Sequence, residues 1–528
     1  MADYYRYKQY SEMRLPLKGD IDLTYRCNNN CRHCWLVIPN TKKNSSDELK
    51  LQEWIALIDQ ARALGTREWS ISGGEPMLRE DFAELAGYIK SKSIYYTVFT
   101  NGMYITPAIA KLLKGCDLQI SLYGATAEVY DHITRHPGGY EQLMQGIARL
   151  HEAGTPFTIR AFPMRDNYHQ WPQMLELAHK LAGMVRIGAT WLFLSAGGDP
   201  HRNAEIDAQR LTPEEVIALE PPDVCYDENL LESMGCAVPD RSQGLYAACL
   251  NSRHIFHIDP YGMMSFCSLI KDPRLRYDLR KGTFAQGWEK FIPSLAEFGS
   301  GDGEYASTCG ACEKRTVCRM CPSYSFLEHR RHAAKIDYVC RITDAVERYR
   351  ENWLQNHRRY FSLGGFSIQV DSDQPFTAES LDKRFEPFLA DRKEGEPLQL
   401  QIRHELPKIS NSELGELIYD QPPWRVFKKP NGWIHQCYID DDGERKIMQT
   451  AVFNQTYSKA KIFNRSDSYL AARTKRDTLT HFPSDLLWLS QVLAHHQGFY
   501  LHSAGMIIRN QGVLFVGIRP VKYVCVAN

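Results

Sequence analysis

The stretch IDLTYRCNNNCRHCW spans residues 21–35, and the stretch REWSISGGEP spans residues 67–76. Each begins with a short run rich in β-branched and aromatic residues, which predicts a buried strand. Each then runs into a loop with an unusual set of residues: Cys27, Cys31 and Cys34 in the first, and Gly73, Gly74, Glu75 and Pro76 in the second. The two stretches therefore predict strands whose following loops carry chemistry.

Working outward, short β-rich runs alternate with longer amphipathic ones from Asp20 to Leu194, which predicts repeated βα units and a parallel sheet. Six strands are expected: IDLTY, REWSIS, YYTVFT, DLQISL, FTIRAF and VRIGATWLFL, beginning at Ile21, Arg67, Tyr95, Asp117, Phe157 and Val185. In the helical stretch LQEWIALIDQARALG, an apolar face recurs at steps of three and four, formed by Trp54, Leu57, Ile58 and Ala61. Six such units form an incomplete barrel, with chemistry expected in the loops after the strands.

Composition narrows the class of protein. Lys plus Arg and Asp plus Glu both total 63, so no net charge favours nucleic acid or anionic lipid as a partner. The start MADYYRYKQY lacks the apolar run of a signal peptide, and no run of 18 apolar residues predicts a membrane span. A cytoplasmic protein is expected, and its 15 cysteines then predict metal ligation rather than disulfides.

The CxxxCxxC loop supplies three metal ligands. A structural zinc site needs a fourth protein ligand, whereas a four-iron cluster held by three thiolates keeps one iron open to a small molecule. His33 could complete a zinc site on paper, but a short loop can hardly aim it and its neighbours Cys31 and Cys34 at one ion. The spacing favours the open cluster, with zinc as the alternative.

The sequence CNNNCRHC followed by SGGEP closely resembles the radical S-adenosylmethionine (SAM) superfamily. The resemblance implies a [4Fe-4S] cluster on Cys27, Cys31 and Cys34 whose open iron chelates the amino and carboxylate groups of SAM. One electron then cleaves a sulfur–carbon bond and gives a 5′-deoxyadenosyl radical, so the cofactor carries the difficult chemistry. In the family, the segment that corresponds to residues 73–76 receives the amino group of SAM. Gly73 and Gly74 are expected to let the backbone approach a ligand closely, and Glu75 to supply a carboxylate near a cationic amine.

Three further residues are expected to contact SAM. Asn101 follows the third strand in a Thr-Asn-Gly turn, where a pure turn is an equal alternative. The resemblance implies that the hydroxyl of Ser121, at the end of the fourth strand, contacts the ribose or methionine end of SAM, with simple packing as the rival. Arg135 resembles the position that pairs with the SAM carboxylate, although Thr134 is the alternative alignment.

A second region contains seven ordered cysteines: Cys249, Cys267, Cys309, Cys312, Cys318, Cys321 and Cys340. A zinc ribbon on the middle four is the alternative, but their central gap is far shorter than the usual ribbon loop. With HIDPYGMMSFC, the series resembles the SPASM extension of radical SAM enzymes, which carries one or two auxiliary [4Fe-4S] clusters. Its last pair normally has three intervening residues, and here only Arg319 and Met320 separate Cys318 from Cys321.

The SPASM resemblance implies two ligand sets. Cys249, Cys267 and Cys321 would bind the first auxiliary cluster, and Cys309, Cys312, Cys318 and Cys340 the second. The first set needs a fourth ligand or has an open iron, and Cys236 is the preferred donor, with Cys225 in reserve. Both could equally be unligated thiols.

The C-terminal third includes FPSDLLWLSQVLAHHQGFYLHSAGMIIRNQGVLFVG, which resembles part of a bacterial HPr kinase-like domain. Its phosphate loop would read GxxxxGK[ST], but this chain reads GIRPVKYVCVAN, where Gly517 and Lys522 remain and the second Gly and the hydroxyl residue are absent. This domain is therefore not expected to catalyse ATP-dependent phosphorylation. It is expected to have a docking or structural role. His502 is expected to be a packed histidine, and Cys437 and Cys525 isolated thiols.

The expected fold class is α/β: a partial (β/α)6 radical SAM barrel, a small Cys-rich iron–sulfur domain and a C-terminal α+β domain. The expected divisions are an N-terminal extension (1–18), the barrel (19–235), the SPASM-like domain (236–345), a linker helix (346–361) and a truncated HPr kinase-like domain (362–528). Cys116, at the start of the fourth strand, is expected to be an ordinary buried thiol.

The expected function is a SPASM-type enzyme that abstracts hydrogen from a peptide or protein side chain, because related SPASM enzymes often modify ribosomally made peptides. Flavodoxin or ferredoxin is the expected electron donor. A small-molecule substrate is the enzymatic alternative, and a non-catalytic iron–sulfur or zinc module is the alternative from another class.

Overall fold

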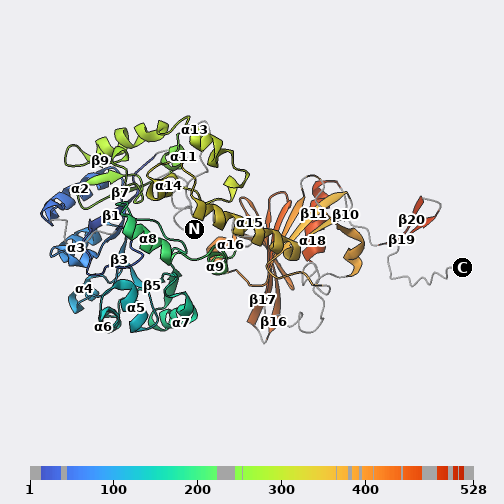
Figure 1. Ribbon diagram of the computed structural model, residues 1–528. Helices are drawn as coiled ribbons and strands as arrows, with labels where there is room; N and C mark the ends of the chain where they lie inside the picture. Colours follow the sequence, from blue (N-terminus) through green and yellow to red (C-terminus); the bar gives the residue numbers. More distant parts are fainter. Residues whose placement is uncertain are drawn as a thin grey trace. The chain divides into compact units, whose positions relative to one another are not determined.

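The computed structural model describes residues 14–36, 45–222, 244–252, 254–363, 365–377, 383–391, 395, 397–407, 409–441, 444–465, 484–497, 503–508 and 511–516. The chain divides into two compact units, Met1–Tyr349 and Arg350–Asn528 (Figure 1). Each unit has a hydrophobic core.

The first unit contains the predicted parallel sheet. Its six strands are β1 (Lys18–Thr24), β2 (Glu68–Gly73), β3 (Tyr95–Thr100), β4 (Asp117–Leu122), β5 (Thr158–Ala161) and β6 (Met184–Ile187). They lie in the order β6-β5-β4-β3-β2-β1, and each pairs in parallel with its neighbour. The connecting helices are α2 (Leu51–Ala63), α3 (Phe82–Lys92), α4 (Pro107–Leu112), α5 (Ala127–Thr134), α6 (Gly139–Ala153) and α7 (Trp171–Leu181). The prediction of six βα units is confirmed.

Period-two alternation gives each strand one apolar and one polar face. On β1, Ile21 and Leu23 are buried in the core, whereas Asp22 and Thr24 point to the other side. The predicted face of α2, from Trp54 to Ala61, is buried. The helices therefore cover the apolar side of the sheet, and the polar side lines the inside of the partial barrel.

Two details of the sheet differ from the prediction. The sixth strand ends at Ile187 rather than Leu194. The next residue, Gly188, packs its backbone against the Phe162 ring, where a Cβ would lie only 2.2 Å from a ring carbon. The sheet also continues on the other side of β1, through the parallel strand β7 (Ile255–Ile258) and then antiparallel β8 (Met263–Ser265) and β9 (Tyr277–Asp278). A four-residue strand such as β7 is too short for alternation to reveal it.

Further helices among the described residues of the first unit belong to the segment after β6 and to the Cys-rich region. They are α8 (Pro200–Gln209), α9 (Pro213–Leu219), α11 (Ala247–Ser252), α12 (Ile292–Ser294), α13 (Gly303–Ser307) and α14 (Pro322–His329).

The predicted linker helix begins earlier and ends sooner than expected. α15 runs Asp337–His357, so it includes Cys340, and residues 358–361 belong to a strand instead. Arg358 leaves the helix because its guanidinium pairs with Asp371 on the neighbouring strand at 2.6 Å. This long-range ion pair has no signal in the local sequence pattern.

The second unit is built on a mixed sheet. Its strands are β10 (Arg358–Leu363), β11 (Phe366–Ser372), β12 (Leu389–Ala390), β13 (Leu398–Arg403), β14 (Glu416–Gln421), β15 (Trp424–Lys429), β16 (Gly432–Asp441), β17 (Glu444–Asn454) and β18 (Lys459–Asn464). Their order is β12-β10-β11-β13-β18-β17-β16-β15-β14, and α16 (Asn411–Leu414) lies beside β15. α18 (Ser484–His495) contributes Trp488, Leu489 and Val492 to the core, and β19 (Ser503–Ile508) pairs with β20 (Gln511–Val516) in a separate hairpin.

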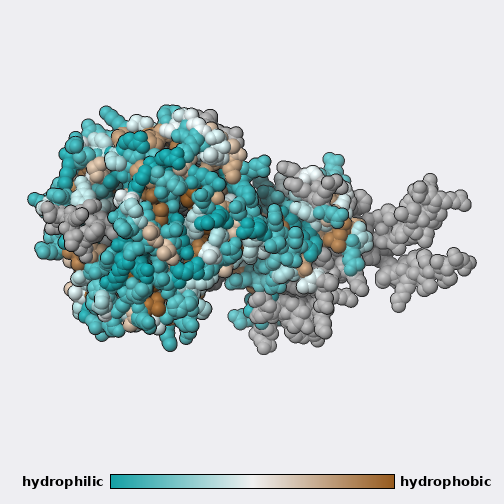
Figure 2. Space-filling view, in the orientation of Figure 1, coloured by the Kyte–Doolittle hydropathy of each residue, from teal (hydrophilic) through white to brown (hydrophobic). Residues whose placement is uncertain are grey.

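The visible surface of the first unit is mainly hydrophilic, and apolar residues are scattered over the described part of that face (Figure 2). None of the helices in the part of the chain that the structure describes has the length and apolar character needed to cross a bilayer.

Candidate active site

The cysteine loop follows β1 directly and is held by backbone bonds. The amide of Cys34 donates to the carbonyl of Cys31 at 3.1 Å, which folds the loop onto itself. The amides of Asn30 and Arg32 donate to the last residues of α5, each at 3.0 Å. The loop is therefore fixed at the carboxyl edge of the sheet, where a barrel of this kind places its chemistry.

The three thiols of this loop lie close enough to influence one another. Burial raises the pKa of Cys27 to about 12, and the neighbouring Glu75 and Cys34 add to the rise. Burial, followed by the charges of Cys34 and Cys27, raises the pKa of Cys31 far above its usual value. With pKa values this high, the thiols stay protonated at neutral pH unless a bound metal supplies positive charge. Metal binding requires the thiolate form, so it would release these protons. The donor set therefore fits an iron–sulfur cluster.

Two observations bear on the zinc alternative. The His33 ring packs 4.7 Å from the Tyr123 ring, and its Nδ1 atom is buried without a hydrogen-bond partner. Among the described residues, no three or more His, Cys, Asp or Glu side chains converge closely enough to hold a single ion. A cluster makes a different demand, because each thiolate binds a different iron.

Arg202 is a supporting residue that the sequence did not single out. It projects from α8, is 8% exposed, and donates from Nη1 to the carbonyl oxygen of Cys31 at 3.0 Å. Its other nitrogen contacts the side chain of Asn30. A charged helix 171 residues away thus holds the cysteine loop, and no local motif marks it.

The two glycines of the GGEP segment approach the cysteine loop rather than open space. The amide of Gly74 donates to the carbonyl of Thr24 at 2.7 Å, and the amide of Glu75 donates to that of Arg26 at 2.9 Å. A Cβ on Gly73 would lie 2.2 Å from the Thr24 oxygen, and one on Gly74 would lie 2.2 Å from the Arg26 oxygen. Gly73 also has a φ of +125°, which glycine tolerates. Pro76 follows as the buried first residue of a 3-10 turn.

The carboxylate of Glu75 is fully buried and is satisfied by the protein. It accepts hydrogen bonds from the Thr100 hydroxyl at 2.9 Å, from the backbone amide of Asn101 at 2.8 Å and from the backbone amide of Met77 at 3.2 Å. The sequence suggested a carboxylate near a cationic amine. In the structure this carboxylate joins the loop after β2 to the loop after β3, and its place near a cationic amine stays a prediction.

The buried Glu75 gives a pH-dependent prediction. Burial raises its pKa from 4.5 to about 7 despite the three donors, so the folded chain binds this proton more tightly than the unfolded chain. The free energy of unfolding of the cofactor-free protein is therefore expected to fall between pH 4.5 and 7, by up to about 3 kcal/mol. Urea unfolding at pH 5 and pH 8 should show this fall in the wild type and a flatter dependence in Glu75→Gln. Equal pH dependence in the two proteins would contradict the assignment.

The other expected SAM contacts lie at the same edge. Asn101 is 8% exposed, and its Nδ2 donates to Oδ1 of Asn28 in the cysteine loop at 2.7 Å. Ser121 is half-buried near the end of β4, and its hydroxyl interacts with that of Tyr123, a ring close to all three thiols. Asn101 and Ser121 therefore lie beside the cysteine loop, and their contact with SAM stays a prediction.

Arg135 has a different environment. It ends α5 in the left-handed conformation with a φ of 53°, and its guanidinium pairs with Glu205 on α8. The alternative Thr134 is fully buried, and its hydroxyl donates to the carbonyl of Tyr130 at 2.9 Å. Arg135 is thus paired with a protein carboxylate in the structure, and the contact of Arg135 with SAM stays a prediction.

The cysteines of the second region gather in two groups. Burial, followed by the charges of Cys318 and Cys312, raises the pKa of Cys309. Burial, then Cys318, raises the pKa of Cys340 on α15 to about 11. The four cysteines expected to hold the second auxiliary cluster are therefore neighbours.

The other three cysteines of this region, Cys249, Cys267 and Cys321, lie near Tyr246. Burial, followed by the charges of Cys321, Cys249 and Cys267, raises the pKa of Tyr246 far above its usual value. These three belong to the expected first auxiliary set. Its proposed fourth donors, Cys236 and Cys225, lie outside the described residues.

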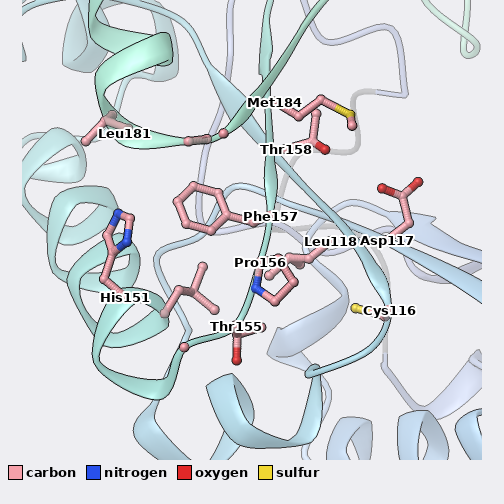
Figure 3. Close-up of a pocket in the computed structure, with 14 residues that line it drawn as sticks. Cys116, Asp117, Leu118, His151, Thr155, Pro156, Phe157, Thr158, Leu181 and Met184 are labelled. Carbon is pink, nitrogen blue, oxygen red and sulfur yellow. The ribbon is translucent and has the colours of Figure 1, made fainter. Parts of the chain in front are cut away.

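A pocket of about 690 Å³ lies at the opposite end of the barrel (Figure 3). Its lining includes Asp117, Thr158 and Met184, which begin β4, β5 and β6. Cys116 also lines it and is only 8% exposed, as expected of a buried thiol. This end of a barrel supports stability rather than chemistry, so the pocket is not the active site.

Most of the C-terminal residues that the sequence analysis named lie outside the part of the chain that the structure describes. Gly517, Lys522, His502 and Cys525 lie outside the described residues. Cys437 on β16 is 2% exposed, as expected of an isolated buried thiol. The HPr kinase-like resemblance stays a prediction.

Comparison with known proteins identifies the family. The radical SAM superfamily model matches residues 21–178. The chain is 31% identical over 311 residues to the mycofactocin maturase MftC of Mycolicibacterium smegmatis, covering 56% of this chain and 76% of that protein. It is 27% identical over 338 residues to the AdoMet-dependent heme synthase of Methanosarcina barkeri, covering 60% and 93%. It is 33% identical over 169 residues to the PqqA peptide cyclase of Ruegeria pomeroyi, covering 31% and 45%.

Among solved structures, Streptococcus suis SuiB bound to S-adenosylmethionine matches with a TM-score of 0.44 and 16% identity, over 64% of this chain and 80% of that one. The region matched by the family model includes the cysteine loop, the GGEP segment and the loops after β3 and β4. With these motifs and the extended similarity to the maturase, the chain belongs to the radical SAM superfamily.

Proposed function

We propose that this enzyme modifies a peptide or protein: it cleaves SAM reductively, and the resulting radical abstracts hydrogen from a side chain of the substrate. Membership of the family implies a [4Fe-4S] cluster and SAM. The observation that carries the proposal is the set of three neighbouring thiols in the loop at the carboxyl edge of a parallel sheet, where Cys31 is buried and Cys27 and Cys34 are half-buried. The peptide substrate is inferred from two relatives, a mycofactocin maturase and a PqqA peptide cyclase.

The chain's own residues have separate tasks in this proposal. Cys27, Cys31 and Cys34 would hold the cluster, which supplies one electron to SAM when bound. The segment Gly73–Pro76 would present backbone groups to the amino group of SAM, since the Glu75 carboxylate is already occupied. Asn101 and Ser121 would orient the cofactor, and Arg135 would reach its carboxylate only by releasing Glu205.

The second region would hold auxiliary clusters. Two sets of ligands are proposed: Cys309, Cys312, Cys318 and Cys340 for one cluster, and Cys249, Cys267 and Cys321 with Cys236 or Cys225 for the other. These clusters would relay electrons to or from the substrate radical, and a flavodoxin or ferredoxin would supply the first electron.

A small-molecule substrate is the second candidate, because the match to an AdoMet-dependent heme synthase covers 93% of that protein. The peptide proposal is tested by co-expressing the enzyme with each short open reading frame beside its gene, and by measuring peptide masses. We expect one peptide to change mass in the presence of the enzyme, and reduced holoenzyme to form 5′-deoxyadenosine. SAM cleavage with every candidate peptide unchanged would favour the small-molecule candidate, and no SAM cleavage would contradict both.

A further inference from the structure

Lys271 lies against both ends of the cysteine loop. Its Nζ donates to the Tyr25 hydroxyl at 3.1 Å and lies 5.4 Å from the centre of the Tyr25 ring. The same nitrogen lies 5.1 Å from the ring of Trp35. Tyr25 stands two residues before Cys27, and Trp35 directly follows Cys34. One ammonium group is therefore bracketed by the residues that flank the three thiols.

The acidic groups around this ammonium already have other partners. Asp22 accepts from Nε2 of His257 at 3.0 Å, and Asp259 pairs with Arg276. Among the described residues, no carboxylate oxygen lies within the 4.0 Å of Nζ that defines an ion pair. Burial lowers the pKa of Lys271 to about 8, and the charges of Asp22, Asp259 and Cys267 oppose the fall, so the group is mainly charged at neutral pH. Cys267 belongs to the expected first auxiliary set, so a test of Lys271 must separate the signals of the two clusters. Lys271 is thus a half-buried cation without an ion-pair partner in the described part of the chain.

A charge in this place has a simple electrostatic consequence. Reduction of an iron–sulfur cluster adds one negative charge, and a nearby cation stabilises the reduced form. In a poorly hydrated interior this interaction is screened much less than at a surface. Charge, burial and hydrogen bonds near a cluster are the features by which proteins set its reduction potential.

We propose that Lys271 raises the reduction potential of the cluster held by Cys27, Cys31 and Cys34. It acts through its charge and not by touching SAM, and so makes the enzyme easier to reduce for SAM cleavage. The inference needs the radical-generating cluster but no particular substrate, so it can fail while the peptide proposal holds, and the reverse.

The test is a redox titration of the reconstituted holoenzyme without SAM, monitored by electron paramagnetic resonance. A variant with Cys27, Cys31 and Cys34 replaced by alanine identifies the signal of the radical-generating cluster by its loss. In Lys271→Met we expect the equilibrium constant for reduction of that cluster to fall about tenfold, which is about 59 mV for one electron. Lys271→Arg, which keeps the charge, should remain near the wild type.

Lys281→Met is the matched control. It removes the same charge from the same region, but Lys281 is 83% exposed and pairs with Asp278 at the surface. Its charge is screened by water, so its removal should leave the potential unchanged. Lys271→Gln, which is neutral and can still bond to Tyr25, replaces Lys271→Met if that variant binds less iron.

The proposal is overturned if the neutral variants keep their iron and the wild-type potential. It is also overturned if only other cluster signals shift, or if Lys271→Arg shifts as far as Lys271→Met, which would indicate packing instead of charge.

Discussion

Replacement of Cys27, Cys31 and Cys34 together by alanine is expected to abolish 5′-deoxyadenosine formation. The variant should also lose about four of the roughly twelve irons expected if all three clusters form. The loss follows because these thiols are the proposed ligands in the loop after β1, and the two other cysteine groups lie elsewhere in the chain. Iron analysis and anaerobic SAM-cleavage assays of the reconstituted proteins measure both effects.

Cys116→Ala provides the control for this variant. It also removes a buried thiol from the barrel, but one that lines the pocket at the start of β4. We expect it to keep its iron and its SAM cleavage. Retention of every iron atom and of 5′-deoxyadenosine formation by the triple variant would refute the assignment of the radical-generating site.

Gly74→Ala is expected to have the second largest effect, although it removes no ligand. The added Cβ would lie 2.2 Å from the Arg26 carbonyl oxygen, which is backbone and cannot rotate away. The strain must move the chain just before Cys27, and a misplacement of about 1 Å near the chemistry can cost about 10²-fold in rate. SAM cleavage by the reconstituted variant, normalised to its iron content, measures the loss.

Gly87→Ala is the matched substitution for Gly74→Ala. Gly87 lies within α3, and the nearest atom to its new Cβ is a Leu112 methyl group at 3.9 Å. Alanine in a helix is favoured over glycine by about 0.5–1 kcal/mol, so this variant should be active and at least as stable as the wild type. Equal activity of the two variants would mean that the contact between the GGEP segment and the cysteine loop is unimportant.

Local pattern predicted the elements that are stabilised by their own periodicity. Trp54, Leu57, Ile58 and Ala61 lie on one helical face at any position in a fold, and the structure buries all four. The six strands were found for the same reason. The pattern failed where contacts with residues elsewhere in the chain accompany the change, as at Arg358, which pairs with Asp371.

Within the site, the sequence was informative about residue type and less so about role. The glycines at 73 and 74 were expected to admit a ligand, and the structure shows that they admit the backbone of Thr24 and Arg26. Arg202, which bonds to the Cys31 carbonyl, was not predicted, because a guanidinium on a charged helix has the same sequence signal as any exposed arginine.

By itself the sequence determined the alternation of strands and helices, the three-cysteine loop and the GGEP segment, because periodicity and ligand spacing are local properties of the chain. Only the tertiary structure decided that Glu75 joins two loops, that Arg202 holds a third, and that Lys271 lies beside the cysteine loop. These are contacts between residues far apart in the chain. Their distances depend on how the helices pack on the sheet, which no local pattern encodes.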